Sequence, residues 1–293
     1  MAIFLKAYQG YSGPLTPPFE RMLVIFRYAL ADVFKSRLFV AFFFISLLLP
    51  LLLMCAIYVY HNLELLLQFE VTPDDLAVID GNAFALVMQI PQNFLLFVMV
   101  MVIGPTMISP DLRNNALPLY LSRPINKASY IFGKLLVLLF LGSLISWVPA
   151  LLLVFVQAYL AGGPWLGDNL HIPLAAVVTS LSWIVTLSLV AFAVSAFVKW
   201  KAMARMAFFG ILLLGSITGE IIEQVFTDGL GGYLVNIFAG QEVLMTALYQ
   251  ADSDLLGFVP HMDTEVAVLQ FLAFSLVALV LLTRRIRAFQ VVS

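Results

Sequence analysis

Two stretches of this sequence hold side chains that could do chemistry, and each adjoins a long apolar run. Glu220 and Glu223 stand three residues apart, which places both carboxylates on one face of a helix. Ionisable groups are costly inside a membrane and are usually functional there, so the pair is a candidate outer gate. The alternative is that both carboxylates reach the water where the helix ends. The second stretch, residues 110–134, alternates charged residues with leucine, isoleucine and tyrosine.

Motifs for catalysis or nucleotide binding are absent from the sequence. Gly133-Lys134 is not part of a phosphate-binding loop, because the upstream glycine and the following hydroxyl are both missing. Neither H-E-x-x-H nor G-x-S-x-G occurs. Three scattered histidines, at His61, His171 and His261, are more typical of ordinary loops than of a metal site. We therefore expect no catalytic residue, metal or cofactor in this chain.

The composition is that of a membrane protein. Hydrophobic residues make up 62% of the 293 residues and charged residues only 11%, against roughly 45–50% and about 25% in soluble domains. A soluble globule of this size could not bury so much apolar surface, whereas lipid accepts it. The first twenty residues hold Lys6 and the pair Pro17-Pro18 without an apolar core, so a cleavable signal peptide is not expected.

Charge-free runs predict six membrane-spanning helices, because about 20 apolar residues cross the hydrocarbon core. The predicted spans are residues 38–60, 84–109, 135–160, 172–198, 206–226 and 266–283. Pro91 and Pro105 are expected near the two ends of the second span, where a proline disturbs a helix least.

All fifteen Lys and Arg residues fall in alternate connections between these spans. They occupy the N-terminal segment, the loops between spans two and three and between spans four and five, and the C-terminal segment. The positive-inside rule makes this set cytoplasmic. We therefore expect a multi-pass protein of the cell (inner) membrane, with residues 1–18 and 284–293 in the cytoplasm.

Residues 19–37 are predicted to form an amphipathic helix that lies in the cytoplasmic interface. Apolar side chains recur there at helical spacing, and they are Phe19, Met22, Leu23, Phe26, Leu30, Val33 and Phe34. The alternative is a plain cytosolic extension of the first span. The expected fold is an all-α integral membrane protein, with this helix preceding the six spans.

Residues 110–134, the predicted cytoplasmic loop between spans two and three, are too apolar for a solvated linker. Exposed apolar groups rimmed by charges indicate a docking surface for a partner. In order, the segment contains Asp111, Ala116-Leu117, Leu121-Ser122-Arg123-Pro124-Ile125, Lys127, and Tyr130 through Lys134. This order resembles the first cytoplasmic loop of ABC-2-type permeases, the membrane subunits of one class of ATP-binding-cassette exporters. Asn114-Asn115-Ala116 departs from that pattern.

The resemblance implies two permease copies, identical or not, and two separate ATPase subunits that carry the ATP and Mg²⁺. It makes residues 110–134 a coupling helix, and residues 227–265 an outer segment that folds back as re-entrant helices. No nucleic-acid partner is expected. The candidate ATPase-coupling residues are Asp111, Arg113, Leu117, Tyr120, Arg123, Pro124, Ile125 and Lys127.

The function expected from the resemblance is that of a permease subunit in an ATP-driven exporter that works by alternating access. Two alternatives stay open at this point. One is a membrane-embedded enzyme acting on lipids or peptides, and the other is an accessory subunit of ABC-like architecture without transport.

Overall fold

The computed structural model describes residues 17–62, 64, 66, 78–116, 126–225, 231–252 and 262–288. Within these ranges every regular element is a helix. In chain order the elements are α1 (Pro18–Val33), α2 (Arg37–Tyr60), α4 (Gly81–Met88), η2 (Gln89–Leu95), α5 (Leu96–Arg113), α7 (Lys127–Ile145), α8 (Trp147–Ala161), α9 (Trp165–Asp168), α10 (His171–Phe197), α11 (Lys201–Val225), α12 (Gly231–Val235), α13 (Ile237–Tyr249) and α14 (Thr264–Ala288).

Six helical stretches of the described residues are long and apolar enough to cross a membrane, which confirms the predicted fold of six spans. They are Arg37–Tyr60, Gly81–Arg113, Lys127–Ala161, His171–Phe197, Lys201–Glu223 and Thr264–Ile286. Several are longer than the charge-free runs, because charged residues at the ends are wound into the helices. Residues 110–113 thus belong to α5 and residues 127–134 to α7, so the connection between these two helices is shorter than residues 110–134.

Side-chain caps set the starts of several helices, among them α2, α4 and α7. The Asn126 Oδ1 accepts a hydrogen bond from the Ser129 N–H at 2.6 Å, so α7 begins directly after Asn126. The Ser36 Oγ accepts from the Phe39 N–H at the start of α2, and the Asp80 Oδ1 accepts from the Ala83 N–H at the start of α4. Each cap satisfies a backbone donor that has no partner within its helix.

The two prolines of span two lie within continuous helix rather than at its ends, so their predicted placement is wrong. Pro91 falls in η2, a π-helical stretch inside Gly81–Arg113. Pro105 lies inside α5. A proline removes one backbone donor, and a local widening to π geometry is one way for a long helix to continue past it.

The π-helical stretch places Gln92 in the protein interior, where it links three segments. Its Nε2 donates to the Ala176 carbonyl oxygen at 3.2 Å and to the Tyr249 hydroxyl at 3.1 Å. Its Oε1 accepts from the Thr179 hydroxyl at 2.9 Å. Gln92 and Thr179 are fully buried. Because buried polar groups must find partners, this network fixes α13 against α10 and η2.

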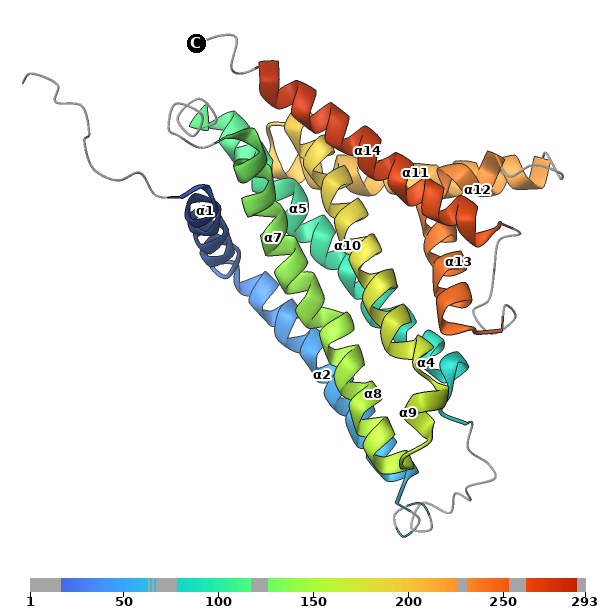
Figure 1. Cartoon of the computed structure of the whole chain (residues 1–293). Coiled ribbons are helices and arrows are strands. Elements are labelled where there is room, and N and C mark those ends of the chain that lie inside the picture. The colour runs from blue at the N-terminus through green and yellow to red at the C-terminus, as the bar shows by residue number, and fades with distance from the viewer. Residues whose placement is uncertain are drawn as a thin grey trace, which may run out of the picture.

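The spans α2, α5, α7–α8 and α10 run alongside one another, as Figure 1 shows. α10 (yellow) is the most buried span and packs against α5, α7, α13 and α14. α1 (dark blue) lies against α7 at one end of this group of spans, and α11 projects to one side together with α12. This arrangement explains why α10 has no polar face, since other helices surround it.

A break at Asn236 separates α12 from α13, and α14 holds it in place. The Asn236 Oδ1 accepts from the Phe238 N–H at 3.1 Å and so starts α13. From α14, the Gln270 Nε2 donates to the carbonyl oxygens of Tyr233, Leu234 and Asn236. These carbonyls lie where the helix is interrupted and would otherwise lack a donor. Asn236 and Gln270 therefore stabilise the break between α12 and α13. Both helices belong to the predicted re-entrant segment, residues 227–265.

α11 and α12 cross in direct backbone contact. A Cβ atom on Gly219 would lie 2.6 Å from the Gly232 carbonyl oxygen, closer than real side chains approach a backbone atom. On α12, Gly232 faces the backbone of Gly219 in the same way. Glycine permits this approach because it has no side chain. α12 therefore packs directly on the backbone of α11 because Gly219 and Gly232 have no side chains.

Replacing Gly219 with alanine should destabilise the protein by about 1–3 kcal/mol, because the backbone of α12 must shift. Gly210→Ala on the same helix is the matched control, since a Cβ atom there meets nothing within 4 Å. The control should be neutral or slightly stabilising, because alanine is the better helix former. Thermal unfolding of the two purified variants in detergent measures the difference, and equal midpoints would contradict the packing described.

Candidate functional site

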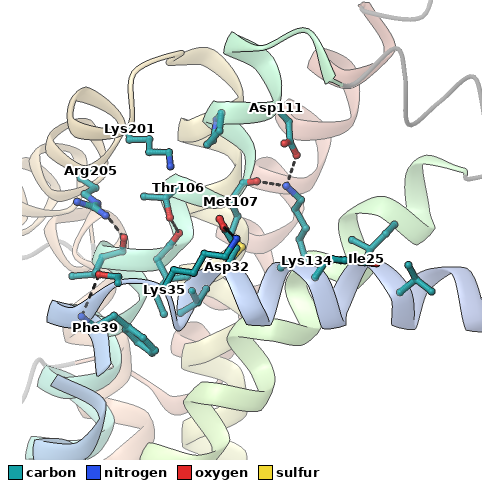
Figure 2. Close-up of a pocket in the computed structure, with 18 of the residues that line it drawn as sticks. Ile25, Asp32, Lys35, Phe39, Thr106, Met107, Asp111, Lys134, Lys201 and Arg205 are labelled. Carbon is teal, nitrogen blue, oxygen red and sulfur yellow. Dashed lines mark hydrogen bonds and ion pairs between the residues drawn. The ribbon is translucent and has the colours of Figure 1, made fainter. Parts of the chain in front are cut away.

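The end of α5 and the beginning of α7, which flank the predicted coupling segment, are joined by a buried polar cluster (Figure 2). The Lys134 ammonium forms an ion pair with the Asp111 carboxylate and donates a hydrogen bond to the Met107 carbonyl oxygen. The Tyr130 hydroxyl donates to the same Asp111 carboxylate at 2.7 Å. Tyr130 is fully buried, and Lys134 is only 7% exposed. We call these three residues the Asp111–Tyr130–Lys134 cluster.

Local sequence explains the geometry of this cluster. Tyr130 and Lys134 are four residues apart on α7, so both side chains lie on one helix face, toward α5. The Tyr130 ring lies 5.0 Å from the Lys134 ammonium and adds a cation–π contact. Asp111 stands in the last turn of α5 and meets both. A charge taken out of water is costly unless it is paired and hydrogen-bonded, and here both charges are.

On the neighbouring face of α7, α1 packs closely against Gly133. A Cβ atom on Gly133 would lie 2.9 Å from the Ile25 Cβ atom and 3.0 Å from the Met22 carbonyl oxygen. The rings of Phe26 and Phe140 meet edge to face at 5.9 Å further along the contact. The order Tyr-x-x-Gly-Lys therefore has two structural roles, because Tyr130 and Lys134 hold α5 while Gly133 holds α1.

α1 is apolar on two sides rather than one. Ile25, which lies off the predicted apolar face, is its one buried hydrophobic side chain among the described residues. Phe19 and Leu23, which lie on the predicted face, are exposed, as are Val24 and Tyr28. The helix packs against α7 on one side and exposes apolar side chains on the other, and its interfacial position stays a prediction.

α1 is also tied to the first span. The Phe34 ring lies 5.6 Å from the Phe39 ring and 5.8 Å from the Phe43 ring, both edge to face. These aromatic contacts and the Ser36 cap leave only a short turn between α1 and α2. Phe34 and Ser36 therefore hold α1 against the start of α2.

The remaining candidate coupling residues divide into described and undescribed ones. Arg113 stacks over the Trp200 ring at 4.6 Å, which connects the end of α5 to the turn before α11. Lys127 is half-buried at the first position of α7. Asn115, in the stretch that departs from the resemblance, has φ 51°, a left-handed conformation that asparagine tolerates at a helix end. The others lie outside the described residues: Leu117, Tyr120, Arg123, Pro124 and Ile125.

Glu220 and Glu223 lie apart from this cluster, toward the other end of α11. Fifteen residues of helix separate Glu220 from Arg205, which is about 22 Å at 1.5 Å per residue. Glu220 is exposed, whereas Glu223 is half-buried beside Gly232 of α12. On α13, burial raises the pKa of the Glu242 carboxyl to about 7, which its position in the sequence did not indicate.

The histidines do not assemble into a site in the described part of the chain. The His61 Nε2 is 3.0 Å from the Gln157 Oε1, which links the end of α2 to α8. His171 begins α10 beside Gly81, and His261 lies outside the described residues. Among the described residues, no group of three His, Cys, Asp or Glu side chains is placed to hold a metal ion.

The sequence profile of the ABC-2 family transporter proteins matches residues 23–284. The chain belongs to the ABC-2 family. A comparison with curated proteins found no match. The residues matched by the ABC-2 family include the first five spans whole, the sixth as far as Arg284, and Asp111, Tyr130 and Lys134. It makes the chain a transporter-family membrane protein, and membrane domains of this family carry no ATPase activity of their own.

Removing one partner of the buried ion pair should lower the stability of the protein far more than removing both. Lys134→Met leaves the Asp111 carboxylate buried without its cation, which costs about 3–5 kcal/mol. The double variant Asp111→Leu/Lys134→Met buries no charge and should recover most of the lost stability. Thermal unfolding of the wild type, both single variants and the double variant gives the coupling between the two positions. Additive losses would show that the pair is not a unit.

Proposed function

We propose that this ABC-2 family protein is the permease subunit of an ATP-driven exporter, paired with a second permease copy and with separate ATPase subunits. The observation that carries the proposal is the Asp111–Tyr130–Lys134 cluster, which fixes both flanks of the segment between α5 and α7. A segment anchored at both ends to buried helices can transmit a push, whereas a free loop would absorb it. The apolar and basic character of residues 117–127 supports docking on a partner.

The described contacts lead from this segment to the spans. Movement of the segment displaces α5 and α7 together through the ion pair. α7 carries α1 through the contact at Gly133, and α1 carries α2 through Phe34 and the Ser36 cap. α5 is linked to α11 as well, because the Arg205 Nε donates to the Val102 carbonyl oxygen at 3.0 Å. Four spans can thus respond to one docking event.

ATP bound by the partner subunits supplies the driving force in this proposal. Nucleotide must bind the two conformations of the complex with different affinity to shift the permease between inward-open and outward-open states. An ion gradient is a poor alternative, because the ionisable groups of the described spans lie toward the span ends rather than at mid-helix. Glu220 and Glu223 line the outer gate in this scheme, with α12 packed against the same helix, α11.

The spans also favour a class of substrate. Apart from Lys134, whose ammonium is paired with Asp111, the buried side chains of the described bundle are apolar or carry uncharged hydroxyl and amide groups. Lipids, hydrophobic drugs or peptides fit this environment better than small ions do. The exposed apolar faces of α2, α11 and α14 are available to lipid and to the second permease copy.

Charge reversal in the coupling segment tests the proposal. Arg123→Glu replaces a positive charge in the proposed docking surface with a negative one. It should therefore abolish the effect of the permease on ATP hydrolysis by an ATPase subunit from the same operon. It should equally abolish ATP-driven movement of a fluorescent phospholipid or hydrophobic dye in proteoliposomes. Co-purification and hydrolysis rates with and without the permease provide the measurement.

Arg284→Glu is the control, since Arg284 is exposed and lies on α14, outside residues 110–134. It should leave binding and hydrolysis unchanged. A permease that neither binds the ATPase nor alters its activity would refute the proposal. Binding and hydrolysis without any ATP-dependent movement of the probes would favour an accessory subunit instead.

A further inference from the structure

A cavity of about 800 Å³ opens between α1, α5, α7 and the start of α11 (Figure 2). Its inner wall is apolar and includes the buried side chains of Ile25, Phe39 and Ile103. Its rim is charged, with five basic side chains against three acidic ones. These are Arg21, Lys35, Lys134, Lys201 and Arg205 against Glu20, Asp32 and Asp111.

Two of the three acids are already neutralised within the protein. Asp111 pairs with Lys134, and Asp32 pairs with Lys35 at 3.1 Å. On the α11 side the cavity is lined by two further basic residues, Lys201 and Arg205, and the third acid, Glu20, lies on α1. The cavity therefore carries an excess of positive charge, which an anionic ligand would balance.

Lys201 and Arg205 stand together on one side of the cavity, opposite the Asp111–Lys134 pair (Figure 2). The Arg205 Nε bond to the Val102 carbonyl oxygen orients the guanidinium. That bond leaves both terminal guanidinium nitrogens without a partner among the described residues, and Lys201 likewise has none there. A planar guanidinium with two free donors, beside an ammonium, matches the geometry of a phosphate group.

The walls indicate that the phosphate belongs to an amphiphile. A soluble anion would gain nothing from the buried apolar wall, whereas an acyl chain would. On the α1 side, Val24 and Tyr28 line the cavity and are 53% and 75% exposed, so the apolar lining continues to the outer face of the helix. Basic pockets between spans on the cytoplasmic side of a membrane suit anionic lipid headgroups.

We propose that this cavity binds an anionic membrane phospholipid, with its phosphate on Arg205 and Lys201 and an acyl chain along the wall formed by α1 and α5. The bound lipid would bridge α1, which packs against α7, and α11, which packs against α5 and α12. The proposal depends on the chain lying in a membrane, and it does not depend on the ATPase or on what is exported.

Lipid binding to the purified full chain tests this site directly. In detergent, phosphatidylglycerol should raise the thermal unfolding midpoint at concentrations where phosphatidylcholine does not, and native mass spectrometry should count bound phosphatidylglycerol. The double variant Lys201→Gln/Arg205→Gln should bind phosphatidylglycerol roughly thirty-fold more weakly, from about fivefold for each basic residue. Both side chains are exposed, so the substitutions should not prevent folding.

Arg37→Gln/Arg284→Gln is the charge-matched control, because both residues are exposed and neither lines the cavity. It should retain wild-type binding. Equal stabilisation by the two lipids, or an unchanged affinity in the cavity variant, would overturn the proposal. Inorganic phosphate forms a separate arm: if phosphate alone reproduced the whole shift and lipid added nothing, the ligand would be a soluble anion and the lipid assignment would be wrong.

Discussion

The buried ion pair between Asp111 and Lys134 is the constraint on which the rest of this end of the molecule depends. Both charges have left water, so each is tolerated only while the other is present. Tyr130 and the Met107 carbonyl oxygen supply further hydrogen bonds to the pair. The last turn of α5 and the first turns of α7 are therefore obliged to stay together, whatever the segment between them does.

Because α5 and α7 are held together, the contacts of α7 with its neighbours link further helices to the same unit. α1 rests on α7 where Gly133 leaves room for Ile25, and α2 follows α1 after a short aromatic turn. A partner that pulls on residues 117–125 would then move a set of helices rather than a loop. The same set of helices borders the basic cavity, so a lipid bound between α1 and α11 would stiffen or restrain the same movement.

The features that could be predicted from the sequence are those that depend on a single continuous segment of the chain. Six spans follow from the length of apolar helix that a membrane requires, and the loop order of Tyr130, Gly133 and Lys134 was recognisable as a pattern. The pattern did not reveal that Tyr130 and Lys134 bind Asp111. Asp111 and Lys134 lie 23 positions apart in the sequence and meet only through tertiary packing. Ile25 was missed because α1 is apolar on two sides, and Pro91 was misplaced because a π-helical stretch lets the helix continue.

If the proposed coupling to an ATPase holds, α1 and α7 move as one body when nucleotide binds that ATPase. Pulsed electron paramagnetic resonance between spin labels at Tyr28 on α1 and Phe132 on α7, both exposed, measures this in the protein assembled with the proposed ATPase subunits. The exposed Cys55 is first replaced by serine so that only the two chosen sites are labelled. We expect one narrow distance distribution that is the same without nucleotide and with ATP trapped. A second, separate distance on ATP binding would contradict it.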